Sequence, residues 1–369
     1  MARETINSLT GLRGVAALWV AMMHGSKMLQ IDPGAPLAVR NAIDCGWVAV
    51  DLFFILSGYV MCYVHLEDFK RLSWSSSWHF WQLRLARIYP AHLVMTLAWL
   101  PVFLVAAIVF PATLTTSVRE QFSGAALLSS LTLTNGWGLP HSQGWNGVSW
   151  SVGSEWFAYL TFPVLATLFN RIRTIRAALL LAASSMIVPF ALAILINGGG
   201  KFSLPWSWTI VRVETEFILG AAIYLINRRA IQRHWATSIL IASGIAIFII
   251  VARDAPGLEI GALIVCFALL IACLAKSPRI GELTLGSRSL VFLGKISYSI
   301  YLSHYLVVVV LRHLSERIVR GAASHLESSL MLVAYLATIV VVGYCLFTAV
   351  EDPARRILRR VWIGRGGTQ

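Results

Sequence analysis

The chain contains 369 residues, of which 57% are hydrophobic and only 13% are charged. Apolar runs of about 20 residues, the length of a helix that crosses a bilayer, recur throughout it, which excludes a soluble protein. The net charge of +13 does not indicate a nucleic-acid partner, because the basic residues gather in short segments between the apolar runs. The sequence therefore predicts an all-α, polytopic membrane protein.

Ten apolar segments are predicted to cross the membrane as helices. In chain order they are residues 9–29, 44–66, 88–111, 148–169, 177–196, 209–227, 236–252, 258–275, 289–313 and 329–350. With the N-terminus inside, most of the 30 basic residues fall on the inner side, as the positive-inside rule requires. Both termini are then predicted to be cytoplasmic, with residues 1–356 forming one membrane domain and residues 357–369 a short basic tail.

The first predicted span carries two residues that are costly in hydrocarbon, Arg13 and His24. Eleven residues at 100° each return His24 to within about 20° of Arg13, about 16 Å further along the axis. Both therefore face one side of the helix, with Arg13 near the inner end and His24 in the outer half. Two simpler interpretations stay open: Arg13 extends to the headgroups, and His24 is a structural hydrogen-bonding residue.

Two acidic residues are predicted at the depth of His24. Asp51 lies in "CGWVAVDLFFILSGY" of the second span, and Glu155 lies in "GWNGVSWSVGSEWFAYLTFP" of the fourth. Each is about two turns from the outer end of its helix, on the order of 10 Å below the surface. Carboxylates and an imidazole at one depth indicate an acid–base centre, although each acid could instead be the structural partner of an arginine.

Two arginines, Arg84 and Arg87, lie one turn apart in "WHFWQLRLARIYP", just before the third predicted span. Their spacing places them on one helix face, on the side of the membrane that Arg13 also approaches. The forked guanidinium group suits phosphate oxygens, so the pair is a candidate phosphate site. Taken alone, an ordinary positively charged inner loop is the simpler interpretation.

Further polar residues occur in other spans. In the ninth span, Ser297, Tyr301 and His304 share a face and are predicted to line the same cavity, with His304 a structural hydrogen-bonding partner rather than the base. Trp150 is either a platform for a sugar ring or part of the interfacial aromatic belt. Near the outer end of the sixth span, three charged residues are predicted to form an internal ion pair or to contact the acceptor: Arg212, Glu214 and Glu216.

Six motifs occur in one order along nearly the whole chain: "LTGLRGVAALWVAMMHG", "VDLFFILSGYVM", "RLARIYP", "WSVGSEWFAYLTFPVL", "LGKISYSIYLSH" and "EDPARR". Together they resemble the acyltransferase-3 family of integral membrane acyltransferases, which O-acylate bacterial cell-envelope and secreted carbohydrates. Members have ten core helices. Many members carry a second acid directly after the glutamate of the fourth helix. This chain has Trp156 at that position, so only Glu155 is a candidate for the acid of this motif.

The resemblance implies roles for individual residues. The family's arginine–histidine signature of the first helix falls on Arg13 and His24, and its paired arginines fall on Arg84 and Arg87. The tryptophan, serine and glutamate of its fourth-helix motif fall on Trp150, Ser151 and Glu155. In this interpretation His24 is the base, Glu155 or Asp51 orients it, and the three arginines bind the donor. The substrate-binding candidates are Trp150, Ser151, Tyr301 and His304.

The implied reaction moves an acyl group, expected to be acetyl from acetyl-CoA, onto a hydroxyl of a surface or exported carbohydrate or its lipid-linked precursor. The expected partners are acyl-CoA, a carbohydrate or glycolipid acceptor and the lipid bilayer, with no metal and no nucleic acid. The expected location is the bacterial inner membrane. Direct transfer to the acceptor and an acyl-histidine intermediate both stay open. The alternative function is a polytopic secondary transporter or exporter, which also carries buried charges.

Overall fold

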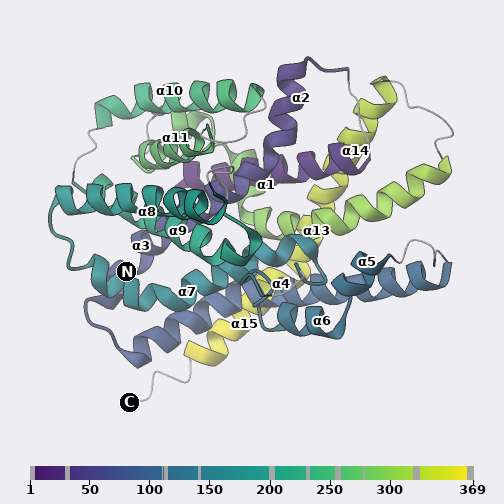
Figure 1. The fold of residues 1–369 in the computed structure, drawn as a ribbon, viewed down its shortest axis with the longest axis horizontal. Helices are drawn as coiled ribbons and strands as arrows, with labels where there is room; N and C mark the ends of the chain where they lie inside the picture. Colours follow the sequence, from purple (N-terminus) through teal and green to yellow (C-terminus); the bar gives the residue numbers. More distant parts are fainter. Residues whose placement is uncertain are drawn as a thin grey trace.

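The computed structural model describes residues 5–29, 34–109, 111, 115–139, 143–198, 204–229, 233–253, 259–276, 279–318 and 325–363. Within these ranges all regular structure is helical (Figure 1). The helices are α1 (Asn7–Met28), α2 (Leu37–Asp44), α3 (Ala49–His65), α4 (Trp74–Val109), α5 (Thr116–Gln121), α6 (Gly124–Leu131), α7 (Trp150–Phe169), α8 (Ile175–Ile196), α9 (Thr209–Asn227), α10 (Arg233–Ala252), α11 (Glu259–Leu274), α12 (Arg279–Leu283), α13 (Arg288–Ile318), α14 (His325–Leu346) and α15 (Asp352–Ile363).

Six helical segments of the described residues are long and apolar enough to cross a membrane. They are Leu37–Phe69, Trp74–Val109, Gly147–Phe169, Ile175–Ile196, Arg288–Leu314 and His325–Trp362. Two shorter apolar helices, Ala236–Ala252 and Glu259–Leu274, accompany them. The prediction of an all-helical, multi-pass membrane protein is therefore confirmed, whereas the count of ten spans and the side of each terminus stay predictions.

Two of the predicted spans, in α1 and α9, are not among these six segments although they contain 22 and 19 residues. Both carry several charged or polar side chains, including Arg13 and His24 in α1 and Arg212 in α9. Much of their surface is buried by other helices rather than directed to lipid. Arg13, His24 and Arg212 are thus partly buried against other helices, and such residues in membrane proteins usually have a function.

The third predicted span needs a correction, because α4 begins at Trp74 and not near residue 88. Its 36 residues correspond to about 54 Å of helix, well beyond the thickness of the hydrocarbon core. Arg84 and Arg87 consequently lie within a continuous helix, not in a loop that precedes it. Residues 110 and 258 of the predicted spans and residues 364–369 of the predicted tail lie outside the described residues.

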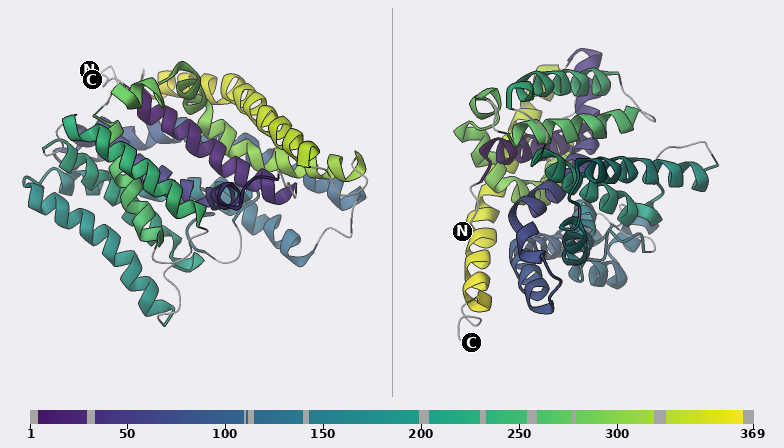
Figure 2. Two further views of the ribbon diagram at one scale, coloured as in Figure 1. Left: turned by 90° about the horizontal axis from the view of Figure 1, so that it is seen from above. Right: turned by 90° about the vertical axis from the view of Figure 1, so that its left-hand side faces the viewer.

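Helices α1 and α13 run parallel and in close contact (Figure 2). A Cβ atom on Gly14 would lie 2.7 Å from the backbone nitrogen of Gly294, so glycine is needed for this approach. Ten residues further along both helices, the ring of His24 contacts the ring of His304. The shared register fixes which residues of α13 face the polar side of α1.

Helices α3 and α9 form a second parallel pair. Asp51 pairs with Arg212 near one end, and Asn227 donates a hydrogen bond of 2.9 Å to the hydroxyl of Tyr59 further along. Helix α3 runs antiparallel to α1, since Gly46 just before α3 packs against Trp19 and Met23, whereas Ser57 and Met61 further along α3 share a cavity with Arg13 near the start of α1. The relative directions of these four helices agree with those of the alternating spans predicted from the sequence.

The polar interior is enclosed by apolar helices on the outside of the bundle. Leu180, Ile187 and Leu195 of α8 are 70%, 64% and 77% exposed, as lipid-facing residues would be. At the other end of the chain, α14 continues through a π-helical turn, Phe347–Glu351, into α15. The predicted domain boundary at residue 356 falls inside α15, and the tail's location in the cytoplasm stays a prediction.

Candidate active site

A partly open cavity of about 160 Å³ lies between α1, α3, α4, α7 and α13. These helices come from positions spread over most of the chain, so only the fold brings their side chains together. The polar residues of its lining are Arg13, Ser57, Arg84, Arg87, Ser151, Glu155, Tyr159, Ser297, Tyr298 and Tyr301. All three arginines predicted from the sequence therefore share one cavity with Glu155.

The three guanidinium groups have few acidic partners. Among the described residues no ion pair or hydrogen bond is recorded for the side chain of Arg13. Arg84 contacts the sulfur of Met61 at 3.5 Å and Nε2 of His65 at 3.3 Å, and its Nε is buried without a partner. Arg87 forms an ion pair with Glu351. Because buried charges are normally paired, this cavity is suited to an anion.

Glu155 is held in the cavity by two hydroxyl groups. Its Oε1 accepts a hydrogen bond of 2.6 Å from Ser57 and one of 2.5 Å from Tyr159. Tyr159 lies one turn after Glu155 on α7, and Ser57 comes from α3. The carboxylate is thus oriented by neutral donors and faces the same space as the arginines.

His24 lies outside the cavity lining and has a different set of partners. Its Nδ1 is 3.1 Å from the carbonyl oxygen of Val20 and 3.1 Å from Nε2 of His304. The Nδ1 of His304 lies 2.6 Å from the carbonyl oxygen of Tyr301. The ring of Tyr305 meets His24 edge-on at 5.4 Å. Tyr301, which does line the cavity, therefore connects it to the histidine pair.

The tautomers of these two imidazole rings follow from the carbonyl groups that they contact. A carbonyl oxygen only accepts, so Nδ1 of His304 carries a proton and its Nε2, in the neutral ring, has a lone pair. This lone pair and the Val20 carbonyl both face Nδ1 of His24, which must then be the protonated nitrogen. The Nε2 of neutral His24 is left as the proton acceptor.

Neither acidic residue predicted to orient His24 contacts it, which corrects the predicted arrangement. Asp51 is 1% exposed and pairs with Arg212, whose Nε also lies 3.3 Å from Glu216. Glu155 contacts hydroxyl groups instead. The reason is geometric: equal depth on separate helices does not determine the face on which each residue lies, and Asp51 is on the face of α3 that packs against α9.

Of the other predicted substrate-binding residues, Ser151 and Tyr301 line the cavity, whereas Trp150 does not. Tyr301 donates to the carbonyl of Val148 at 2.9 Å, and its hydroxyl oxygen is 2.7 Å from that of Ser151. Trp150 packs edge-on against Trp206 at 5.6 Å, so it is part of an aromatic cluster. Ser151 and Tyr301 therefore join α7 to α13 beside the cavity.

Sequence reasoning missed several residues of the site. Ser57 and Tyr159 lack a charge, although Tyr159 is one helical turn from Glu155 and could have been found by that spacing. Glu351 was visible as the acid of "EDPARR", but its pairing with Arg87 joins positions 264 residues apart. No local pattern predicts such a contact.

The chain was compared with known proteins. The family model described as an acyltransferase domain matches residues 6–348. Acyltransferase MdmB of Streptomyces mycarofaciens is 31% identical over 378 residues, which cover 96% of this chain and 92% of that protein. No solved structure matches the chain significantly.

Two further relatives match over part of their length. The putative peptidoglycan O-acetyltransferase YrhL of Bacillus subtilis (strain 168) is 28% identical over 335 residues, covering 83% of this chain and 49% of YrhL. The O-acetyltransferase OatA of Staphylococcus aureus (strain NCTC 8325 / PS 47) is 26% identical over 331 residues, covering 82% and 50%. The chain spans about half the length of these two proteins. Since the family model and MdmB both match it nearly end to end, the chain belongs to the acyltransferase-3 family of membrane acyltransferases.

Proposed function

We propose that this protein is an O-acetyltransferase that moves the acetyl group of acetyl-CoA onto a hydroxyl of a cell-envelope carbohydrate. Family membership supports acyl transfer over the alternative of a secondary transporter. The names of YrhL and OatA support O-acetylation, and that of YrhL makes peptidoglycan the first acceptor to test. The proposed location is the inner membrane, with ten spans and both termini in the cytoplasm.

The observation that carries the proposal is the cavity lined by three arginines. Arg13 and Arg84 have no acidic partner among the described residues, and Nε of Arg84 is buried without any partner. An anionic ligand would supply the missing acceptors, and the phosphate groups of CoA fit guanidinium donors well. The cavity is smaller than CoA, so the arginines are proposed to bind a phosphate-bearing part of it, with the rest outside.

His24 is the proposed general base, acting through Nε2. The donor supplies a thioester whose carbonyl carbon can be attacked. As the acceptor hydroxyl attacks, its proton passes to Nε2, the new C–O bond forms, the C–S bond breaks and the thiolate leaves. The charged imidazole keeps its Nδ1 proton directed at His304 and Val20, whose acceptor atoms stabilise it. General base catalysis of this kind contributes a factor of about 10² to 10⁴.

The remaining candidates receive roles that their contacts support. Glu155 is proposed to balance the arginine charges in the cavity and to order Ser57 and Tyr159. Ser151 and Tyr301 are proposed to line the part of the cavity nearest the histidine pair, where the thioester of the donor would approach His24. Trp150 stays a candidate for contact with the substrate. Asp51 is proposed to hold α3 against α9 through Arg212 rather than to act in the reaction.

The test is transfer of labelled acetyl from acetyl-CoA by the purified protein in detergent, with peptidoglycan fragments as acceptors. The expected result is a labelled, O-acetylated acceptor and free CoA in equal amounts. Reconstituted vesicles give the control for the alternative function, since a transporter would move substrate without breaking the thioester. Binding of acetyl-CoA with no transfer to any envelope carbohydrate would contradict the proposal.

A further inference from the structure

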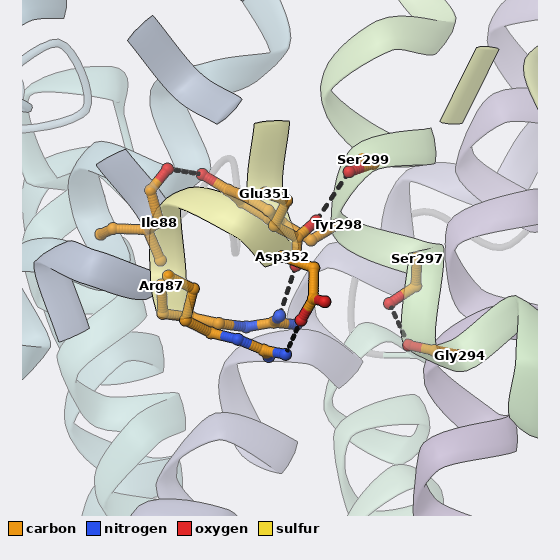
Figure 3. A network of polar contacts seen from close by, with 9 residues as sticks. Arg87, Ile88, Gly294, Ser297, Tyr298, Ser299, Glu351 and Asp352 are labelled. Carbon is orange, nitrogen blue, oxygen red and sulfur yellow. Dashed lines mark hydrogen bonds and ion pairs between the residues drawn. The ribbon is translucent and has the colours of Figure 1, made fainter. Parts of the chain in front are cut away.

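The acid of the last motif, Glu351, is the most completely buried charged residue among those that contact the site. It is 0% exposed, whereas the side chain of its partner Arg87 is 21% exposed and lines the cavity. One carboxylate oxygen pairs with Nη1 of Arg87, and the other accepts a hydrogen bond of 2.6 Å from Ser299 of α13 (Figure 3). Both oxygens are therefore occupied, and Glu351 itself is held in one orientation.

The local sequence explains how the acid reaches this position. Pro353 lacks an N–H group and its ring excludes the carbonyl four residues earlier, so a regular α-helix cannot continue unchanged through it. The chain forms a π-helical turn at Phe347–Glu351 immediately before α15. Such widened turns are often found at functional sites, and this one directs Glu351 inward between α4 and α13.

The backbone of α4 is fixed at the same level. Tyr298, which precedes Ser299 on α13, donates a hydrogen bond of 2.6 Å to the carbonyl of Ile88, the residue after Arg87 (Figure 3). Two adjacent residues of α13 thus fix the surroundings of Arg87, Tyr298 through the backbone of the following residue, Ile88, and Ser299 through Glu351. A guanidinium has five N–H donors, and the recorded ion pair uses one nitrogen. The others are left for a ligand in the cavity.

We infer that Glu351 is a positioning residue that holds Arg87 in the geometry required to bind the anionic part of the acyl donor. This inference rests on the proposed function, because it assumes that Arg87 contacts the donor. Glu351 does not itself line the cavity. Its effect on donor binding must therefore pass through Arg87. This dependence on Arg87 distinguishes a positioning role of Glu351 from a general contribution to the stability of the fold.

The experiment measures binding of acetyl-CoA to purified protein by calorimetry, with turnover measured in parallel. Glu351→Asp keeps the negative charge but shortens the arm by one methylene, so it displaces Arg87 without leaving it unpaired. We expect the Kd for acetyl-CoA to rise about tenfold, since displacements on the scale of 1 Å have large effects. The KM for the acceptor should change little. Ser299→Ala, which frees one oxygen of the carboxylate, should act in the same direction but more weakly.

The matched control is Asp352→Asn, which removes the neighbouring negative charge. Asp352 pairs with Arg355 and Arg356 of its own helix, so its loss should leave donor affinity within about twofold of the wild type. Combination with Arg87→Ala provides the decisive comparison. In that background Glu351→Asp should cause no further loss of affinity, because the side chain through which it acts is absent.

Three outcomes would overturn the inference. Unchanged affinity in folded Glu351→Asp would do so, and so would an equal loss in the presence and absence of Arg87. If Glu351→Asp fails to accumulate, unchanged affinity in Ser299→Ala would have the same consequence. A different result identifies failure of the proposed function: if Arg87→Ala itself binds acetyl-CoA normally, the donor site is not at these arginines, and the inference falls with it.

Discussion

Replacement of His304 tests whether this residue orients the proposed base. His304 is 0% exposed and its Nε2 accepts from Nδ1 of His24 at 3.1 Å. His304→Leu removes the acceptor while keeping an apolar side chain of similar size in the core. His24 then keeps only the carbonyl of Val20 as an acceptor for its Nδ1 proton. The ring should be less firmly oriented, and its charged form should be less well stabilised.

The magnitude follows from the change in charge during the reaction. A hydrogen bond between neutral groups contributes about 0.5–1.5 kcal/mol, and one from a charged group about 1.5–3 kcal/mol. The bond to His304 therefore strengthens by about 1–1.5 kcal/mol when His24 takes up the proton in the transition state. Its loss should lower kcat by roughly tenfold, since about 1.4 kcal/mol corresponds to a factor of ten.

The assay is acetyl transfer at saturating acetyl-CoA, with the donor KM determined separately. His304→Gln is the matched variant, because its amide oxygen can accept from His24 while its NH₂ donates to Tyr301. We expect kcat to fall in His304→Leu and to recover largely in His304→Gln, with the donor KM unchanged in both. Wild-type kcat in His304→Leu, or an equal loss in the two variants, would refute the assignment of His304 as an orienting acceptor.

Three further variants test the site as a whole. His24→Ala should accumulate normally in the membrane but lose acyl transfer, and near-wild-type acylation would exclude His24 as the base. Glu155→Gln should lower turnover with little change in acetyl-CoA affinity; failure of this variant to accumulate would instead indicate a structural role. Replacing Arg84 and Arg87 together by alanine should raise the Kd for acetyl-CoA at least tenfold, because charge-assisted hydrogen bonds to the donor are lost. If titration with acetyl-CoA shows unchanged affinity, these arginines are not part of the donor site.

The sequence predicted the helical architecture and the face of α1 on which the candidate residues Arg13 and His24 lie. Apolar length alone identifies most helices, and the spacing of Arg13 and His24 requires them to lie on one side of α1. In the structure, His24 on this side of α1 contacts His304 of α13, and Arg13 on the same side lines the cavity. Periodicity within one helix is thus a sufficient guide to which of its residues lie together.

Contacts between helices could not be predicted in the same way. The pairing of Asp51 with Arg212, of His24 with His304 and of Arg87 with Glu351 depends on how each helix is rotated about its own axis. A sequence gives the depth of a residue in its helix but not this rotation. The start of α4 was also missed, because polar and aromatic residues precede its apolar part and give no span-length signal.

The contacts explain why the orienting group of the proposed base is an imidazole and not a carboxylate. Three acids of the site and its surroundings have other partners: Asp51 pairs with Arg212, Glu351 pairs with Arg87, and Glu155 accepts from two hydroxyl groups. A carboxylate beside His24 would favour the protonated imidazole before the acceptor arrives, and a protonated ring cannot act as a base. Neutral His304 fixes the same tautomer without adding a charge, so His24 can keep its lone pair until the hydroxyl attacks. The separation of the acids from the histidine pair is therefore compatible with the proposed role of His24 as a general base.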